Sequence, residues 1–216
     1  MARILVIGGS RGIGLAVCRT AAARGHFVRA MARDGKIPRD IHGTCEAFIG
    51  DARNTADVAR ALEGIDVVVQ ALGVPQSLDF ILKPVTLFSE ATRILLPAMK
   101  QASVSKLVAV TGFGAGDSRD AINFLQRPAF ELIFRNAYDD KSIQEALIAE
   151  SDLEWLIVRP GVLMNWPTRG KYTVLTRQSE WRNGIVGRVD VADFIVKPIE
   201  ADALNRQKPV IIRYPL

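Results

Sequence analysis

The stretch ILVIGGSRGIG at residues 4–14 joins a run of large aliphatic residues to a glycine-rich turn and the start of a helix. The aliphatic run, residues 2–7, has the composition of a buried parallel strand. Glycines in the turn let the backbone bend tightly, approach a pyrophosphate closely and pack the next helix against the strand. That helix, expected over residues 12–24, would present free N–H groups and the positive end of its dipole to the phosphates. The stretch therefore predicts a dinucleotide-binding turn, and its candidate contacts are Gly8, Gly9, Ser10, Arg11, Gly12, Ile13 and Gly14.

The rest of the chain alternates aliphatic strand patterns with helical patterns. Strands are expected over residues 26–33, 46–50, 65–72, 106–111 and 154–159. Helices are expected over residues 55–62, 86–102 and 129–149. The less regular remainder is expected to hold a strand at 171–175, a helix at 189–200 and a strand at 209–213. This alternation predicts an α/β fold of the Rossmann type, with a doubly wound, mainly parallel sheet and helices on both faces.

Length, composition and charge restrict the class of protein. The 216 residues suit a single NAD(P)-binding domain over 1–216, with a small substrate-side region from about 113–128 and 161–188. The 28 Lys and Arg residues outnumber the 23 Asp and Glu residues, but they are scattered, unlike the basic stripe of a nucleic-acid-binding surface. No apolar run approaches the ~20 residues that span a bilayer. We therefore expect a small-molecule substrate as partner, no nucleic acid, no membrane, and a monomer or homodimer.

Cysteine and histidine usage gives no sign of a metal site. Cys18 and Cys45 have no metal-ligand spacing, and the only histidines are His26 and His42. Buried free thiols in a reducing compartment are the expected state of the two cysteines. The N-terminal residues show no signal-peptide pattern, so a cytoplasmic location is expected.

Ligand-binding residues of such sheets follow the carboxyl ends of the strands. Asp51 is placed to accept from an adenine amino group, although a turn or helix-capping role is an equal alternative. Thr111 offers a hydroxyl at its strand end, or is simply a β-branched strand residue. The other candidates at strand ends are Ala52, Ala71, Leu72, Gly73, Pro160, Gly161 and Val162.

Two arginines favour NADP(H) over NAD(H) as the cofactor. An acidic residue at the end of the second strand would bind the ribose of NAD. Arg33 stands there instead, and Arg11 lies inside the glycine turn. Guanidinium groups suit a 2′-phosphate through charge-assisted hydrogen bonds. Asp34, one residue later, keeps NAD(H) open as an alternative.

Three motifs resemble those of the atypical short-chain dehydrogenase/reductase proteins: GGSRGIG, the DAR that follows the third strand, and DDKSIQEALIAESDLEWLIVRPGVL at residues 139–163. Within these, the sequence is similar to the NAD(P)H-binding group that includes flavin/biliverdin reductase and NmrA-like proteins. The segment GRVDVADFIVKPIE at residues 187–200 also matches that group. The resemblance implies NADP(H) binding, with Lys141 facing the nicotinamide. It leaves the reaction open, because members differ in activity.

One departure concerns the catalytic residues. The well-studied catalytic branch pairs a tyrosine with a lysine four residues later, whereas here Ala137 lies four and Tyr138 three positions before Lys141. Successive helical residues are rotated by about 100°, so Tyr138 is expected to point away from the crevice. Thr111 and Lys141 are then the candidate catalytic residues.

Aromatic residues near the expected crevice suit a flat, conjugated acceptor. Phe113 and Trp166 are the candidate substrate-side residues, whereas Phe130 and Phe134 have the helical spacing of core residues. The resulting hypothesis is an NADPH-dependent reductase of a flavin, quinone or tetrapyrrole type of acceptor. The alternative is a non-catalytic NADP(H)-binding redox-sensing regulator. An epimerase-like enzyme is the weaker alternative, because it needs a proton-handling residue.

Overall fold

The computed structural model describes residues 1–34, 45–74, 83–167 and 170–216. Eight strands form its main sheet: β1 Arg3–Ile7, β2 Phe27–Ala32, β3 Cys45–Ile49, β4 Val67–Gln70, β5 Lys106–Val110, β6 Glu154–Pro160, β8 Thr173–Leu175 and β10 Val210–Ile212. Their order is β3-β2-β1-β4-β5-β6-β10-β8. All the strand pairings are parallel except that of β10 with β8. The sheet thus grows outward in both directions from β1, which confirms the predicted doubly wound fold.

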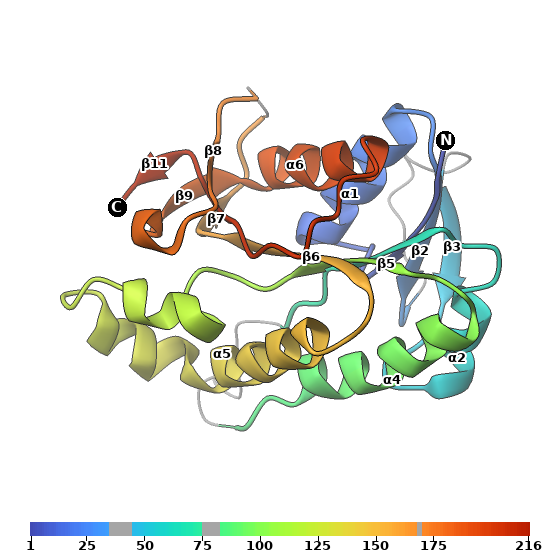
Figure 1. Ribbon diagram of the computed structural model, residues 1–216, viewed down its shortest axis with the longest axis horizontal. Helices are drawn as coiled ribbons and strands as arrows, with labels where there is room; N and C mark the ends of the chain where they lie inside the picture. The colour runs from blue at the N-terminus through green and yellow to red at the C-terminus, as the bar shows by residue number, and fades with distance from the viewer. Residues whose placement is uncertain (35–44, 75–82, 168–169) are drawn as a thin grey trace.

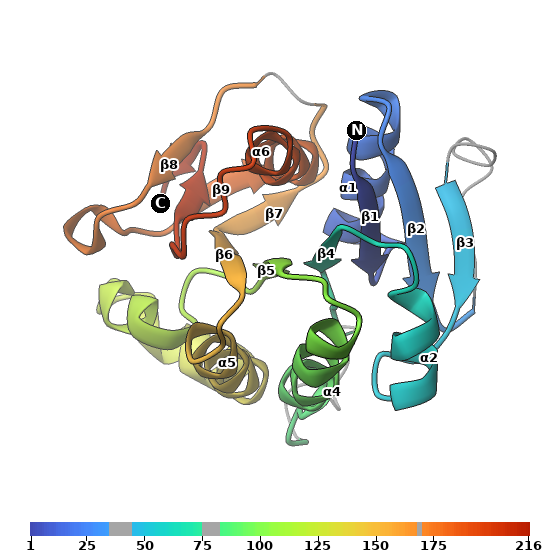
Figure 2. The ribbon, with the colours of Figure 1, turned by 45° about the vertical axis from the view of Figure 1, so that its right-hand side comes forward.

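Helices cover both faces of this sheet (Figures 1 and 2). One face carries α1, Gly12–Ala23, and α6, Arg188–Glu200, which lie side by side. The other face carries α2, Thr55–Ala61, α4, Leu87–Gln101, and α5, Arg127–Ala149. The helix α5 starts two residues earlier than expected, because Pro128 is tolerated in a first turn, where its missing N–H has no intrahelical partner.

The core lies on both sides of the sheet. Alternate residues of a strand point to opposite faces, so Ile4 and Val6 pack in the cluster with α1 and α6, and Leu5 and Ile7 in the cluster with α2 and α4. All four side chains are buried. This double burial explains why β1 is a continuous aliphatic run rather than an alternating one.

A second, three-stranded sheet was not expected from the sequence. It consists of β7, Val162–Met164, β9, Gly184–Gly187, and β11, Tyr214–Pro215, in the order β11-β9-β7. Two short 3-10 helices, η2 at Gly116–Ala121 and η3 at Gln178–Glu180, belong to the connecting segments. Figure 2 shows β7 and β9 beside α6, beyond the end of β6.

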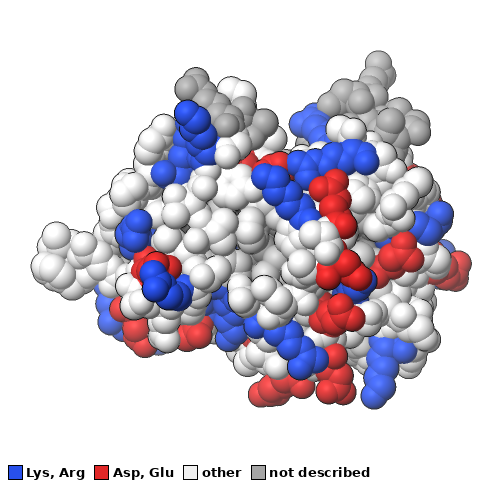
Figure 3. All heavy atoms as spheres, turned by 45° about the horizontal axis from the view of Figure 1, so that its top comes forward, with Lys and Arg blue, Asp and Glu red and all other residues white. Residues whose placement is uncertain are grey.

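Figure 3 shows basic side chains spread among acidic and uncharged ones on the face that it presents. None of the helices in the described part of the chain has both the length and the apolar character that a membrane crossing requires.

Candidate functional site

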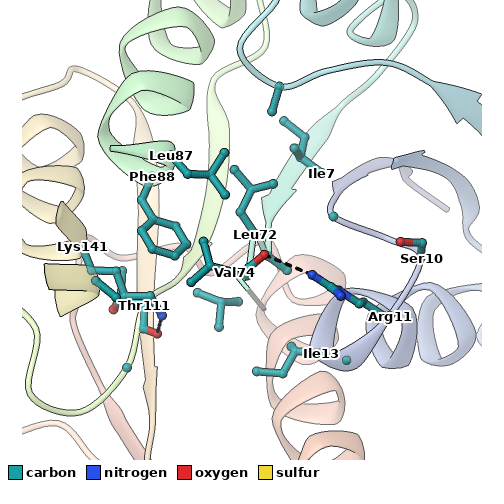
Figure 4. A pocket seen from close by; sticks show the side chains of 18 of the residues that line it. Ile7, Ser10, Arg11, Ile13, Leu72, Val74, Leu87, Phe88, Thr111 and Lys141 are labelled. Atoms are coloured by element: carbon teal, nitrogen blue, oxygen red, sulfur yellow. Dashed lines mark hydrogen bonds between the residues drawn. The ribbon is translucent and has the colours of Figure 1, made fainter. Parts of the chain in front are cut away.

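A cleft of about 900 Å³ opens at the carboxyl ends of the parallel strands. It is lined by most of the residues predicted to bind the cofactor: Gly8, Ser10, Arg11, Gly12, Ile13, Arg33, Asp51, Ala52, Ala71, Leu72, Gly73, Thr111, Lys141, Pro160 and Gly161. In Figure 4 the glycine turn with Ser10 and Arg11 lies at one end of the view, and Thr111 and Lys141 lie at the other.

The glycines of the turn have two different roles. Gly12 has a φ of +60°, and a Cβ added there would meet no described atom within 4 Å, so this part of the wall is open. Gly73, on the opposite wall, is equally open. A Cβ on Gly14 would instead lie 2.1 Å from the carbonyl oxygen of Gly8, so Gly14 allows α1 to pack against the strand end.

The N-terminus of α1 offers backbone donors to the cleft. Arg11 is the N-cap residue, and no side chain caps the first turn, which also contains no acidic residue. The guanidinium of Arg11 reaches across the cleft and donates to the carbonyl oxygen of Gly73 at 3.5 Å (Figure 4). A contact of this length is weak, so the guanidinium can turn to an anion bound at the helix end.

Arg33 follows β2 and lines the cleft as an exposed side chain. It makes no hydrogen bond or ion pair with any other residue that the structure describes. Asp34 lines the cleft beside it. Asp51 accepts from the backbone N–H of Arg53 at 2.9 Å through Oδ1, while its Oδ2 lies 3.6 Å from the Arg53 guanidinium. The turn-capping role of Asp51 is therefore present in the structure.

Thr111 is anchored by a buried ion pair. Its hydroxyl donates to Oε1 of Glu145 at 2.7 Å, and Nε of Arg159 donates to the same oxygen at 3.0 Å. Arg159 is also paired with Asp117, and both Glu145 and Arg159 are buried. A single hydroxyl donates one hydrogen bond, so the Thr111 hydroxyl faces Glu145 and only its oxygen lone pairs remain for a ligand.

Lys141 lies at the same end of the cleft, on α5. Its ammonium donates to the backbone carbonyl oxygen of Thr111 and lies 5.1 Å from the ring centroid of Phe88. Burial lowers the pKa of Lys141 from its ordinary 10.5 to about 8, against the opposing effect of the nearby Glu145 carboxylate. Desolvation disfavours the charged form of an amine, and the ammonium still predominates at neutral pH.

Tyr138 was expected to point away from the crevice, and this expectation is wrong. Tyr138 lines the cleft together with Ala137. A Cβ on Gly112 would lie 2.6 Å from the Tyr138 hydroxyl, so this oxygen rests against the backbone that follows β5. The helix is uninterrupted over this region. The long phenol ring, packed against Phe130 at a centroid distance of 4.8 Å, reaches the cleft from the adjacent helix face.

Five predicted residues do not line the cleft. Gly9 and Gly14 support the turn from behind, and Val162 is exposed on β7. Phe113 was expected on the substrate side, but its side chain is 5% exposed and packs in a separate core cluster with Ile122 and Leu175, among others. Packing in this cluster removes the apolar Phe113 ring from water.

Trp166, the other expected substrate-side residue, lies outside the cleft lining. Its ring packs edge-on against Tyr214 at a centroid distance of 6.3 Å. The cleft is also lined by side chains that were not named as site residues from the sequence: Leu87, Phe88, Phe134, Leu163 and Arg188. Of these, Phe134 is the one that the sequence singled out as aromatic and near the crevice, although as a core residue. Leu163 and Arg188 lie within the segment 161–188 that was expected to contribute to the substrate-side region.

The sequence of residues 8–202 matches the family described as NAD(P)H-binding. The chain belongs to this family. Among curated proteins of similar sequence, the photosystem II assembly factor Ycf39 of Synechocystis is 25% identical over 219 residues, which cover 97% of this chain. The match covers 62% of that relative, so the chain spans less than two thirds of its length.

Solved structures share the fold of this NAD(P)H-binding protein over almost its whole length. ChuY from Escherichia coli O157:H7, described as an anaerobillin reductase, has a TM-score of 0.81 at 25% identity and covers 98% of this chain and 97% of its own. A short-chain dehydrogenase/reductase from Veillonella parvula in complex with NADP has a TM-score of 0.81 at 16% identity, covering 98% of this chain and 95% of its own. These neighbours confirm the resemblance to atypical short-chain reductases.

The residues of the cleft fit a nicotinamide dinucleotide. The open positions at Gly12 and Gly73 leave the walls clear, and the uncapped N-terminus of α1 provides donors for phosphate oxygens. Arg33 supplies a guanidinium that no described carboxylate neutralises. The same cleft continues to Lys141, so one continuous site extends from the glycine turn to the half-buried ammonium.

Proposed function

We propose that this protein is an NADPH-dependent reductase of a small, flat, conjugated acceptor of the flavin, quinone or tetrapyrrole type. The observation that carries the proposal is the composition of the cleft near Lys141. Phe88, Phe134 and Tyr138 line it there, next to the backbone of Thr111 and Gly112. Aromatic walls on a site that continues into a dinucleotide cleft suit a planar acceptor stacked beside the nicotinamide.

The preference for NADPH rests on Arg33. Its side chain is exposed at the mouth of the cleft after β2, where the adenosine ribose of a dinucleotide lies in such folds. A guanidinium without a carboxylate partner is suited to a 2′-phosphate. Arg11 supports the same choice from the glycine turn, because its contact with Gly73 is weak enough to be exchanged.

The chain's own residues position the reactants rather than react. When bound, the cofactor supplies a hydride to the acceptor. Arg159 and Glu145 fix Thr111, and Thr111 in turn accepts from Lys141, so the ammonium is held at one place in the cleft. Burial raises the pKa of Tyr138 to about 12, which makes the phenol a poor proton donor at neutral pH. The acceptor would then take its proton from solvent.

The experiment is NADPH oxidation by the purified protein against a panel of flavins, quinones and linear tetrapyrroles. The proposal predicts turnover with at least one of them. The similarity to ChuY, described as a reductase, supports this outcome. The alternative is a non-catalytic NADP(H)-binding regulator, which the similarity to the assembly factor Ycf39 favours. Tight NADPH binding without turnover of any acceptor would select that alternative.

A further inference from the structure

We infer that Arg188 is a specificity-determining residue that binds an anionic group, carboxylate or phosphate, on the edge of the acceptor. The inference rests on the proposed function, because it assigns a ligand to the acceptor end of the same cleft. Arg188 is the first residue of α6 and lines the cleft with Pro160, Gly161 and Leu163. From the sequence it was included only in the broad substrate-side region 161–188, and not as a named site residue.

The guanidinium of Arg188 is held by one of its three nitrogens. Nη1 donates to the side-chain oxygen of Asn165 at 2.7 Å and to the carbonyl oxygen of Leu163 at 3.4 Å. Both acceptors are neutral, so they orient the group without cancelling its charge. Within the described part of the chain, Nε and Nη2 of Arg188 have no acceptor. These two nitrogens form a fork of parallel donors that matches the two oxygens of a carboxylate or phosphate.

The charge of the surrounding cleft favours an anion at this place. The acidic residues among the described lining are Asp34 and Asp51, which follow β2 and β3 near the glycine turn. Lys141, on α5, also lines the cleft, and its ammonium is tied to Thr111. Arg188 and Lys141 thus add two positive charges to the lining, and the nearby Glu145 carboxylate, which is not part of the lining, is paired with Arg159. A partly desolvated cation stabilises an anionic ligand.

The lining of the cleft combines apolar and charged groups. Phe88, Phe134 and Leu163 supply flat or aliphatic surface, and Arg188 adds a single oriented cation. An acceptor that fits both is a planar conjugated ring system with an acidic substituent on its edge. The ring would contact the aromatic residues, and the substituent would pair with the fork formed by Nε and Nη2.

The test compares acceptors that differ only in their acidic group. Biliverdin is paired with its dimethyl ester, and FMN with riboflavin, so that each source of the anion has its own neutral control. Wild type, Arg188→Met, Arg188→Lys and the control Arg182→Met are assayed for NADPH-dependent kcat/KM. Arg182 is exposed and outside the described cleft lining. The Kd of each acceptor for the NADP⁺ complex, the Kd of NADP⁺ and Tm are measured in parallel.

We expect wild type to prefer the anionic member of at least one pair by ~10- to 100-fold, the usual contribution of a charged hydrogen bond. Arg188→Met should abolish the preference, Arg188→Lys should retain part of it, and Arg182→Met should leave it intact. The affinity for NADP⁺ and Tm should stay close to wild type. If Arg188 binds a carboxylate, the preference appears in the biliverdin pair. If it binds a phosphate, the preference appears in the FMN pair.

Three results would overturn the inference: an equal preference in wild type and Arg188→Met, loss of NADP⁺ affinity in Arg188→Met in place of acceptor selectivity, or no binding of any acceptor. The acceptor Kd values separate this inference from the proposed function. Selective binding without turnover sustains the role of Arg188 and defeats the reductase. Turnover without a preference for the anionic acceptors sustains the reductase and defeats the role of Arg188.

Discussion

The hydroxyl of Tyr138 rests against the Cα of Gly112, so closely that a Cβ on Gly112 would lie 2.6 Å from the phenol oxygen. This contact joins α5 to the backbone that leaves β5, at the end of the cleft that also holds Lys141. Phe130 and Phe134 pack edge-on against the Tyr138 ring at centroid distances of 4.8 and 6.0 Å. The three aromatic residues are spaced at four-residue intervals, which places them along one side of α5.

Tyr138→Phe should leave any reductase rate within a few-fold of wild type. The phenol lies in the cleft, but burial raises its pKa to about 12, far from the neutral range in which a general acid is efficient. Steady-state kcat for NADPH oxidation by wild type and variant checks this. Because general acid catalysis contributes ~100- to 10,000-fold, a hundredfold loss of kcat with unchanged NADPH affinity would identify Tyr138 as the proton donor.

Lys141 should make the protein more stable as the pH rises from about 8 to 10.5. Burial lowers the pKa of Lys141 in the folded state to about 8, whereas the ordinary value is 10.5. Between these values the unfolded state binds more protons, so the free energy of unfolding increases with pH. The measurement is the Tm difference between wild type and Lys141→Met, which should shift in favour of wild type across that range. A Tm difference that does not change with pH would show that Lys141 is not desolvated.

Gly73→Val should weaken NADPH and NADH binding at least about tenfold while Tm changes little. The side chain would project into open space in the cleft, since no described atom lies within 4 Å of a Cβ there. Gly14→Ala is the matched contrast: its Cβ would lie 2.1 Å from the Gly8 carbonyl oxygen, so it should lower the unfolding free energy by ~1–3 kcal/mol. Calorimetric titration and thermal melts of both variants test whether Gly73→Val loses cofactor affinity and Gly14→Ala loses stability. Unchanged NADPH affinity in Gly73→Val would mean that the cofactor does not pass this wall.

Arg33→Ala should weaken NADPH binding by about ten- to a hundredfold, the loss of one charged hydrogen bond. NADH affinity should change much less, because NADH lacks the 2′-phosphate. Arg93→Ala, an exposed arginine outside the described cleft lining, serves as the control for net charge. Equal losses for the two cofactors in Arg33→Ala would show that Arg33 does not contact the phosphate.

The glycine turn and the main sheet could be predicted because their signals are local. Ile4 to Gly14 contains a strand, a turn and a helix start in continuous sequence, and both Gly12 and Gly14 have the roles that the pattern indicates. The order of the elements then follows from the handedness of parallel crossovers. Strand bounds were shifted by one or two residues at several ends, as expected where helices and strands fray.

The acceptor end of the cleft could not be predicted because tertiary packing assembles it. Leu163 lies on a three-residue strand that pairs with β9, and the local sequence pattern does not predict this pairing. Arg188 comes next to Leu163 across 25 residues of sequence. Phe113 and Trp166 were chosen for aromatic character alone, and the structure uses both in packing against other apolar residues. The angle between Tyr138 and Lys141 on the helix did not predict where the Tyr138 ring lies, because a long side chain can reach a site from the neighbouring helix face.

The cleft between the glycine turn and Lys141 is expected to hold NADPH. Calorimetric titration of the purified wild-type protein with NADPH tests it most directly, with Gly73→Val as the variant in which the cleft is blocked. We expect one site with a Kd in the low-micromolar range or tighter, weaker binding of NADH, and a matching rise in Tm. A wild-type protein that shows neither heat of binding nor thermal shift with NADPH or NADH would show that the cleft does not bind a nicotinamide dinucleotide.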